Sequence, residues 1–354
     1  MTTYIIRRLL IVPVLLFGVT IIIFGMLMLL RPEERASLYI RDYPRNPLAV
    51  EGVIKRYQLD KPIYIQYWNW LVGVKDPNTG EITGGILRGN LGYSKVNSQP
   101  VAEVITDRFP ATLELAIWSF LPIIGVGIWL GIQAAINHNK FFDQFARVFS
   151  IVGTSFPTFV FGLLVLMLFY AKLRWFPPGR ISDWVSALIL KGEFIPHTGI
   201  MTLDAIINGR FDIFLDALRH LVLPVLTLSY VNWALFLRIT RSSMLEALNQ
   251  DYMTTAKAKG VSSKDSINKH ALPNALIPVV TIAGFTVIML LGGVVITETI
   301  FSYPGIGSAA ARAAAQLDVV TVLGFAIFNG VILIFANLVV DILYAIIDPR
   351  VRLS

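Results

Sequence analysis

Long runs of apolar residues alternate with short polar segments along the chain. The first run, Leu9 to Leu30, contains no charged residue, and an α-helix needs about 20 residues to cross the hydrocarbon core of a bilayer. Five further runs, almost free of charge, span Leu115–Asn137, Val148–Ala171, Leu221–Leu237, Leu276–Thr297 and Val319–Ile347. The pattern predicts an all-α polytopic membrane protein with six transmembrane helices.

The first run also has some features of a secretory signal peptide. Its apolar core is longer than the roughly 7–15 residues of a cleaved signal, and no small-x-small site follows it. We therefore expect residues 1–30 to form the N-terminus and an uncleaved first transmembrane helix.

The charged residues indicate the orientation of these spans. Lys and Arg outnumber Asp and Glu in residues 1–8, 138–147, 238–275 and 348–352, which six spans would place on one side of the membrane. Positively charged loops are typical of the cytoplasmic side, whereas long loops are exempt from this rule. We therefore expect cytoplasmic N and C termini, a large extracytoplasmic loop at 31–110, and a core domain at 111–354 with five spans and the cytoplasmic loop 238–275.

Aromatic residues are concentrated in one part of the long outer loop, DKPIYIQYWNWL. Asp60 fits an N-cap and Pro62 the first turn of a helix. Tyr and Trp favour the headgroup region, which predicts a short helix lying on the outer face of the membrane. A helix packed inside a small external domain would bury the same aromatic rings.

Composition and motifs argue against several classes of protein. The chain is 55% hydrophobic and 15% charged, and it has no cysteine, which excludes disulfides and thiolate metal sites. Its net charge of +7 fits cytoplasmic loops better than nucleic-acid binding. It lacks a Walker A loop, a His-Glu-x-x-His motif and a Gly-x-Ser-x-Gly elbow. The four histidines show no metal-ligand spacing. We predict no catalytic residue and no metal site.

Ionisable residues are rare inside the predicted spans. Asp341 lies near the inner end of the last span and fits a carboxylate that reaches polar surroundings, and Glu298 lies at the outer end of the fifth. Ion-coupled carriers usually place such groups in mid-span. The energy source for any transport is therefore expected on another chain.

Several uncharged polar residues do occur inside the spans. In lipid such groups are costly, so they are expected to face other helices or a water-filled path. Hydrogen bonding between helices is one interpretation, and lining a path for a hydrophilic solute is the other. The candidate path residues are Ser229, Tyr230, Asn232, Asn329 and Asn337.

The loop 238–275 has signals of a helix–turn–helix. Apolar residues from Met244 to Met253 recur near helical spacing, which predicts an amphipathic helix. Gly260 fits a helix C-terminus, and Ser262 with Asp265 resembles a capping box that starts a second short helix. Pro273 is expected to end that helix just before the fifth span.

This loop resembles the cytoplasmic loop of ABC-importer permeases. The shared features are a cluster of small residues, a glycine, and a Leu-Pro pair after a fixed spacing, here Thr255–Ala256, Gly260 and Leu272–Pro273. The stretch DYMTTAKAKG, Asp251–Gly260, is similar to the loop of the B-type dipeptide/oligopeptide permeases. A glutamate typical of the wider group is Thr254 here, and a typically apolar position is His270.

Other segments resemble the same B-type branch and together cover most of the chain. They are YIIRRLLIVPVLL at the start, Gly89–Ala116, GGVVITETIFSYPGIG at Gly292–Gly307, and DPRVR at Asp348–Arg352. The family's usual motif after the first span is replaced by LLRPEER, and the external loop is enlarged.

The resemblance implies a permease subunit in a bacterial or archaeal plasma membrane. Its partners would be a second homologous permease, two cytoplasmic ATP-binding subunits and an extracytoplasmic solute-binding protein. ATP and Mg would bind the ATPases, and this chain would hold no cofactor. The implied ATPase-coupling residues are Asp251, Tyr252, Thr255, Ala256, Ala258, Lys259, Gly260, Val261, Ser262, His270, Leu272 and Pro273. The implied outer gate or docking residues are Glu298, Tyr303, Pro304 and Gly305.

The sequence leaves the cargo open. Within the family, peptides are the first expectation, oligosaccharides the main alternative, and nickel complexes a lesser one. Outside it, an ion-driven secondary carrier remains a competing class, and a membrane-embedded enzyme is disfavoured by the missing catalytic motifs.

Overall fold

A computed structural model describes residues 2–36, 39, 47–75 and 80–347 of the chain. Within these residues, five helices are long and apolar enough to cross a bilayer, or six if one bent pair counts as a single span. The chain is mostly helical and polytopic, as predicted. The long helices are α1 (Thr2–Leu27), α5 (Val101–Ile136), α10 (Phe211–Leu248), α13 (Leu272–Leu291) and α16 (Val319–Ile347).

The predicted span Val148–Ala171 is not one straight helix. The chain instead forms α6 (Phe141–Ser155) and α7 (Thr158–Val165), which continues into the π-helical segment η2 (Leu166–Lys172). The two halves meet at 101°. Phe156 is extended because it precedes Pro157, and proline disfavours the helical conformation of the residue before it.

Other span boundaries also differ from the prediction. Helix α10 extends far beyond Leu221–Leu237 at both ends, and its polar ends are covered by neighbouring segments. The span predicted to reach Thr297 ends at Leu291, because Gly293 has a φ of +91° that breaks the helix. Glu298 therefore lies on a separate short helix. Only α16 keeps its predicted bounds.

Residues between α1 and α5 form a small subdomain. It contains α2 (Pro32–Ala36), α3 (Pro47–Arg56), α4 (Ile63–Val72) and η1 (Ile86–Arg88). Strand β1 (Val74–Lys75) pairs antiparallel with β2 (Ile82–Thr83), and β3 (Tyr93–Ser94) pairs antiparallel with β4 (Gln99–Pro100). The domain boundary predicted at 110 falls inside α5.

The aromatic helix α4 packs against the rest of the protein with one face. Trp70 is buried beside Phe24 of α1, with the ring centroids 5.3 Å apart. Tyr64 and Trp68 on the other face are exposed. The prediction that Asp60 caps this helix is wrong, because Pro62 occupies the cap position and no side chain caps it.

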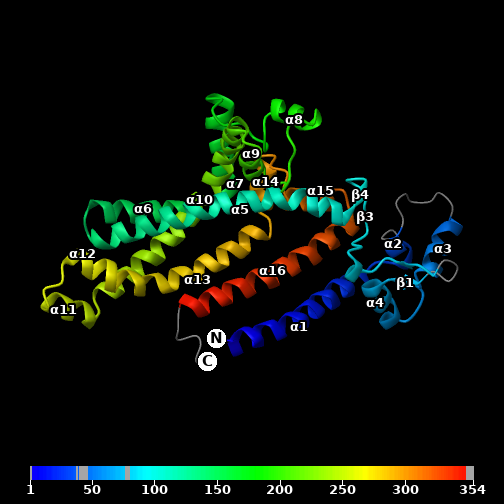
Figure 1. The fold of residues 1–354 in the computed structure, drawn as a ribbon, viewed down its shortest axis with the longest axis horizontal. Helices are drawn as coiled ribbons and strands as arrows, with labels where there is room; N and C mark the ends of the chain where they lie inside the picture. The colour runs from blue at the N-terminus through cyan, green and yellow to red at the C-terminus, as the bar shows by residue number, and fades with distance from the viewer. Residues whose placement is uncertain (1, 37–38, 40–46, 76–79, 348–354) are drawn as a thin grey trace.

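Four further short helices lie between the long helices in the sequence. They are α8 (Asp183–Leu190), α9 (Met201–Ile207), α14 (Val295–Ile300) and α15 (Ile306–Ala315). The segment between α10 and α13 contains α11 (Asp251–Ala258), α12 (Ser263–Asp265) and the π-helical η3 (Ser266–Ala271). Figure 1 shows α11 and α12 at one end of the long helices and the subdomain with α2–α4 at the other.

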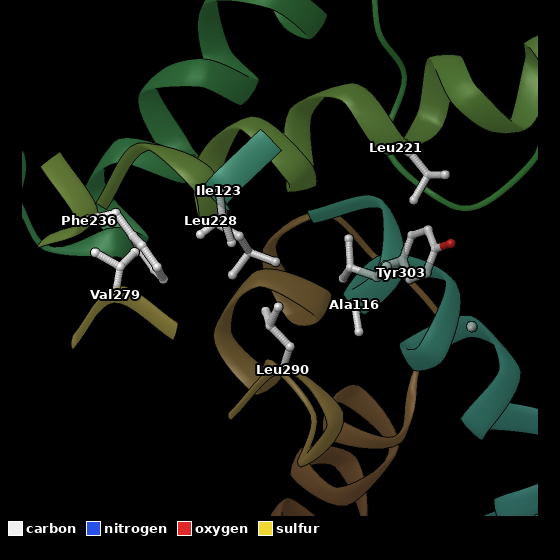
Figure 2. Close-up of a cluster of buried hydrophobic side chains, with 10 residues drawn as sticks. Ala116, Ile123, Leu221, Leu228, Phe236, Val279, Leu290 and Tyr303 are labelled. Atoms are coloured by element: carbon white, nitrogen blue, oxygen red, sulfur yellow. The ribbon is translucent and has the colours of Figure 1, made fainter. Parts of the chain in front are cut away.

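The main apolar core lies where α5, α10 and α13 meet. Figure 2 shows Ile123, Phe236 and Val279 from these three helices within one cluster. Helices α5 and α10 approach closely, because a Cβ on Gly131 would lie 2.5 Å from Cβ of Thr240. At the other side of the bundle, Arg8 of α1 forms an ion pair of 2.9 Å with Asp341 of α16. This pair confirms that Asp341 reaches polar surroundings.

Candidate functional site

The elbow, which we define as residues 249–273, connects α10 to α13 and protrudes at the end of the long helices (Figure 1). The predicted continuous helix from Met244 to Met253 is wrong, because α10 ends at Leu248 and α11 begins at Asp251. Met244 and Met253 nevertheless belong to the same buried cluster. The periodicity therefore arose from a shared core and not from one helix.

Gly260 turns the chain at the tip of the elbow. Its φ is +76°, which favours glycine over residues with a side chain. The Val261 N–H donates to the carbonyl of Ala256 at 3.1 Å, as expected at a helix C-terminus. Ser262 Oγ then accepts a hydrogen bond from the Asp265 N–H at 3.1 Å and caps the next helix. The predicted turn and serine cap are confirmed.

Pro273 does not end the second helix as predicted. The helix runs without interruption from Ser263 to Leu291. The wider π-helical turn at Ser266–Ala271 precedes the proline, and such turns accommodate a residue that lacks an N–H. The elbow is thus joined to α13 by one continuous helix.

The inner face of the elbow is an apolar joint. Its buried residues come from α5, α10, α11, η3 and α13, and they are Ala135, Met244, Ala247, Met253, Ala271 and Ala275. Met253 is 1% exposed and is the only one of them on α11. The joint therefore connects α11 to the ends of α10 and α13 by close apolar packing.

The solvent-exposed face of the elbow is polar and carries mostly positive charge. Lys257, Lys259 and Lys264 are exposed, while Asp265 pairs with Lys269 at 2.9 Å. Most of the predicted coupling residues lie on this exposed face, and they are Asp251, Tyr252, Thr255, Ala258, Lys259, Gly260, Ser262, His270 and Pro273. Ala256 is buried and Val261 and Leu272 are partly buried. The elbow therefore offers a free surface on top of a packed joint.

A buried carboxylate braces α10 just before the elbow. Asp143 of α6 is fully buried and accepts hydrogen bonds from Arg241 Nη2 at 2.9 Å and from Arg147 Nη2 at 2.7 Å. It also caps the preceding turn through the Asn139 N–H. In the sequence these residues stand out only as loop charges. The four-residue spacing of Asp143 and Arg147 was the available signal.

The candidate path residues lie in different surroundings. Ser229 is buried, and the Tyr230 ring stacks on Phe161 with centroids 4.2 Å apart. Asn232 donates to the Leu228 carbonyl of its own helix at 2.7 Å. Asn337 is exposed on α16. The Oγ of Ser229 and the Oδ1 of Asn329 have no hydrogen-bond partner among the described residues, as expected of groups that need water or another chain.

Glu114 of α5 is the centre of a buried network at the opposite end of the helices. It is 1% exposed and accepts hydrogen bonds from Arg180 Nη2 at 2.7 Å, Tyr303 Oη at 3.0 Å and the Thr202 N–H at 2.6 Å. Burial would lower the pKa of Arg180, but the adjacent Glu114 carboxylate raises it above its usual value. Burial also raises the pKa of Tyr303. Sequence reasoning selected Tyr303 and missed Glu114 and Arg180, which are 66 residues apart.

Glu298 lies in a second cradle next to this network. Its carboxylate accepts hydrogen bonds from Thr112 Oγ1 at 3.0 Å and from the Ser308 N–H at 2.7 Å, and burial raises its pKa. Glu298, Tyr303 and Gly305 are buried, while Pro304 is partly exposed. The predicted gate residues thus tie α14 and α15 to α5, and three of the four are covered in this conformation.

Gly305→Ala is expected to destabilise the folded protein by about 1–3 kcal/mol, the usual cost of overpacking. A Cβ at this position would lie 2.4 Å from Cδ of Glu298, although the backbone itself would tolerate alanine. Thermal unfolding of the detergent-purified protein measures the change. Gly125→Ala is the control, because nothing lies within 4 Å of its added Cβ. Equal midpoints for the two variants would contradict the tight cradle.

The described residues provide no evident metal centre. No group of three or more His, Cys, Asp or Glu side chains among them could hold a metal ion. The buried carboxylates described above are occupied by arginine, hydroxyl and backbone N–H donors. The described residues thus form a polar elbow on an apolar joint at one end of the long helices, and buried hydrogen-bond networks around Glu114 and Glu298.

Comparison with known proteins identifies relatives over the whole chain. Residues 127–353 match the family described as "Binding-protein-dependent transport system inner membrane component", and residues 1–116 match its N-terminal counterpart. The "Di/tripeptide transport system permease protein" of Pseudomonas aeruginosa is 37% identical, with 99% of each chain covered. The "Dipeptide transport system permease protein" of Escherichia coli is 35% identical, again with 99% of each chain covered. An "Oligopeptide transport system permease protein" of Bacillus subtilis is 35% identical over 99% of this chain and 100% of its own length.

Proposed function

Because the chain belongs to the inner-membrane-component family of binding-protein-dependent transport systems, we propose that it forms one half of the translocation path of an ATP-driven peptide importer. As a member of this family it is a multi-pass plasma membrane protein and a transport subunit, and ATP hydrolysis belongs to other subunits. The observation that carries the proposal is the elbow, whose exposed polar face sits on an apolar joint with α10 and α13.

The cargo follows from the relatives reported above. Their names specify dipeptides, di- and tripeptides or oligopeptides. These names favour short peptides over the oligosaccharides and nickel complexes that the sequence left open. An ion-driven carrier gains no support from Asp341, the carboxylate within the last span, because it is paired with Arg8.

In the assembly this chain would contact four kinds of partner. A second homologous permease would complete the path, and two ATPases that bind ATP and Mg would each grip one elbow. An extracytoplasmic binding protein would deliver the peptide to the outer end, and lipid would cover the remaining apolar faces. The exposed lysines of the elbow fit an ATPase cleft with acidic residues.

The topology that fits this assembly has six spans, with α6 and α7 together forming one broken span. Both termini and the elbow would be cytoplasmic, and residues 31–100 would be extracytoplasmic. The positive charge of the elbow and its position opposite the subdomain support this orientation (Figure 1). The core permease unit then begins with α5 at Val101.

The elbow residues Asp251–Ser262 would contact the ATPase, and closure of the ATPase pair would tilt α10 and α13 as rigid levers. Ser229, Tyr230, Asn232, Asn329 and Asn337 would border the path once the second permease is present. Glu298, Tyr303, Pro304 and Gly305 would hold the outer gate through the contacts with Thr112 and Glu114.

Deleting Gly260–Lys269 tests the coupling role. The variant should still insert in the membrane, because the spans are unchanged, but the ATPase subunits should no longer co-purify with it. A matched deletion in the subdomain, residues 76–79, should leave co-purification intact. Retention of the ATPase at native affinity after removal of the elbow tip would overturn the proposed function.

A further inference from the structure

The extracytoplasmic subdomain contains a groove of about 350 Å³ between the subdomain and the start of α5. One wall is formed by Tyr39 and Tyr57, whose rings stack with centroids 3.8 Å apart. The groove is also lined by Gly84, by the segment Arg88–Tyr93, and by Pro100 and Ala102. Residues from separate parts of the chain thus border one hollow.

Short-range hydrogen bonds hold the glycine-rich segment Gly84–Gly92 in one shape. The Asn90 side chain accepts from the Gly92 N–H at 3.1 Å, and the Asn90 N–H donates to the Gly85 carbonyl at 3.2 Å. Gly84, Gly85, Gly89 and Gly92 all have positive φ. Glycines with this conformation let a ligand approach the backbone closely. The hollow is therefore built before any ligand arrives.

Among the described residues that line the groove, Arg88 is the one that carries a charge. Its Nε donates to the Val72 carbonyl at 3.1 Å, which fixes the direction of the guanidinium group. Within the described part of the chain, its two Nη groups have no hydrogen-bond or ion-pair partner. No Asp or Glu is among the described lining residues. A fixed guanidinium with two free N–H-bearing nitrogens is suited to bind a carboxylate with both oxygens.

The size of the groove indicates a small ligand. Pockets for small molecules have volumes of roughly 300–1,000 Å³, whereas a stable protein interface needs about 800 Å² on each partner. The tyrosine rings offer apolar surface and hydroxyl groups beside the positive charge of Arg88. Burial raises the pKa of Tyr39, so its hydroxyl stays protonated and can donate. A short peptide with a free C-terminal carboxylate is complementary to these features of the groove, because it has a negative charge, peptide groups that accept hydrogen bonds, and apolar side chains.

We propose that this groove binds the C-terminal carboxylate of a short peptide through Arg88, with the rest of the peptide along the tyrosine wall. The proposal rests on the proposed function, because the peptide would be the cargo on its way from the binding protein to the spans.

The groove is also tied to the last span. Ser94 Oγ of β3 donates to Asp318 Oδ2 at 3.0 Å, and the Val96 N–H donates to the same oxygen at 3.2 Å. Asp318 in turn caps α16, because its Oδ1 accepts a hydrogen bond from the Thr321 N–H at 3.2 Å. A ligand in the groove therefore contacts a wall that is fixed to the transmembrane bundle.

Equilibrium binding of trialanine to the purified full transporter, without its binding protein, tests the proposal. Trialanine with a free carboxylate should bind, and trialanine amide should bind about 10- to 100-fold more weakly, the range for a charge-assisted hydrogen bond. Arg88→Gln should weaken binding of the free acid to the level of the amide. Ala102→Trp should also weaken it, because the indole would fill the groove while Arg88 stays in place. Arg31→Gln, an exposed arginine of the same subdomain, is the matched control and should bind normally.

Unfolding midpoints like that of the unaltered transporter would show that the variants are folded. Equal binding of acid and amide, absence of binding at millimolar peptide, or normal binding by Arg88→Gln would each overturn the proposal. An effect of Arg88→Gln that is confined to docking of the binding protein would also overturn it, by assigning the groove to a protein carboxylate. The elbow deletion is independent of the groove: loss of ATPase co-purification with normal binding by Arg88→Gln would remove the groove proposal alone.

Discussion

Arg180→Met is expected to destabilise the folded protein by about 3–5 kcal/mol, the usual cost of removing one partner of a buried ion pair. Glu114 would remain buried at 1% exposure and would lose the two hydrogen bonds from the guanidinium group. The remaining donors, Tyr303 Oη and the Thr202 N–H, would not neutralise its charge. The unfolding midpoint of the detergent-purified protein would fall accordingly.

Two controls separate this effect from loss of side-chain volume. The double variant Glu114→Gln/Arg180→Met removes both charges and should recover a large part of the lost stability, because no unpaired buried charge remains. Arg210→Met removes an arginine that pairs with Asp212 at 2.7 Å in a solvent-exposed position, and should leave the unfolding midpoint almost unchanged, because water screens an exposed ion pair. A double variant as unstable as Arg180→Met would argue against a charge effect.

The transmembrane part of the fold could be predicted from the sequence because lipid makes one strong demand. A long apolar run must be helical to satisfy its backbone in lipid, and α16 accordingly has its predicted bounds, Val319–Ile347. The same argument cannot locate bends or ends that depend on single residues. Pro157 splits the third run, and Gly293 ends the fifth before its apolar residues end.

The elbow was predictable because its signals are local. Gly260 and the Ser262–Asp265 spacing each determine the conformation of a few neighbouring residues. Pro273 was misleading, because the π-helical turn before it absorbs the proline and the helix continues. A single proline thus indicates a preference for a helix end, and an adjacent π-helical turn can remove the need for that end.

The buried networks could not be predicted from one sequence. Glu114 meets Tyr303 across 189 positions, and Ser94 meets Asp318 across 224. Each of these residues is common in loops and helix ends, so its type alone indicates no partner. Their positions are set by how α5, α9, α15 and α16 pack, and that information is not contained in any short segment.

Met253→Ala is expected to uncouple ATP hydrolysis from peptide uptake while the ATPases stay bound. Met253 joins α11 to the buried cluster at the ends of α5, α10 and α13. Truncation of this buried side chain should lower the stability of the packed joint by about 2–5 kcal/mol. This loss is enough to let α11 move without the spans. The exposed face of the elbow, including Lys257 and Gly260, would be unchanged.

The measurement is the ratio of peptide imported to ATP hydrolysed in proteoliposomes that contain the complete transporter. This ratio should fall about tenfold or more in Met253→Ala, since every 1.4 kcal/mol changes an equilibrium tenfold. Met253→Leu keeps nearly the same volume and should retain most of the coupling. Met167→Ala, at a side chain that is 62% exposed, should have no effect on the ratio. An unchanged ratio in Met253→Ala would mean that motion reaches the spans through the Ser263–Leu291 helix alone, and the packed joint would then have no role as a lever.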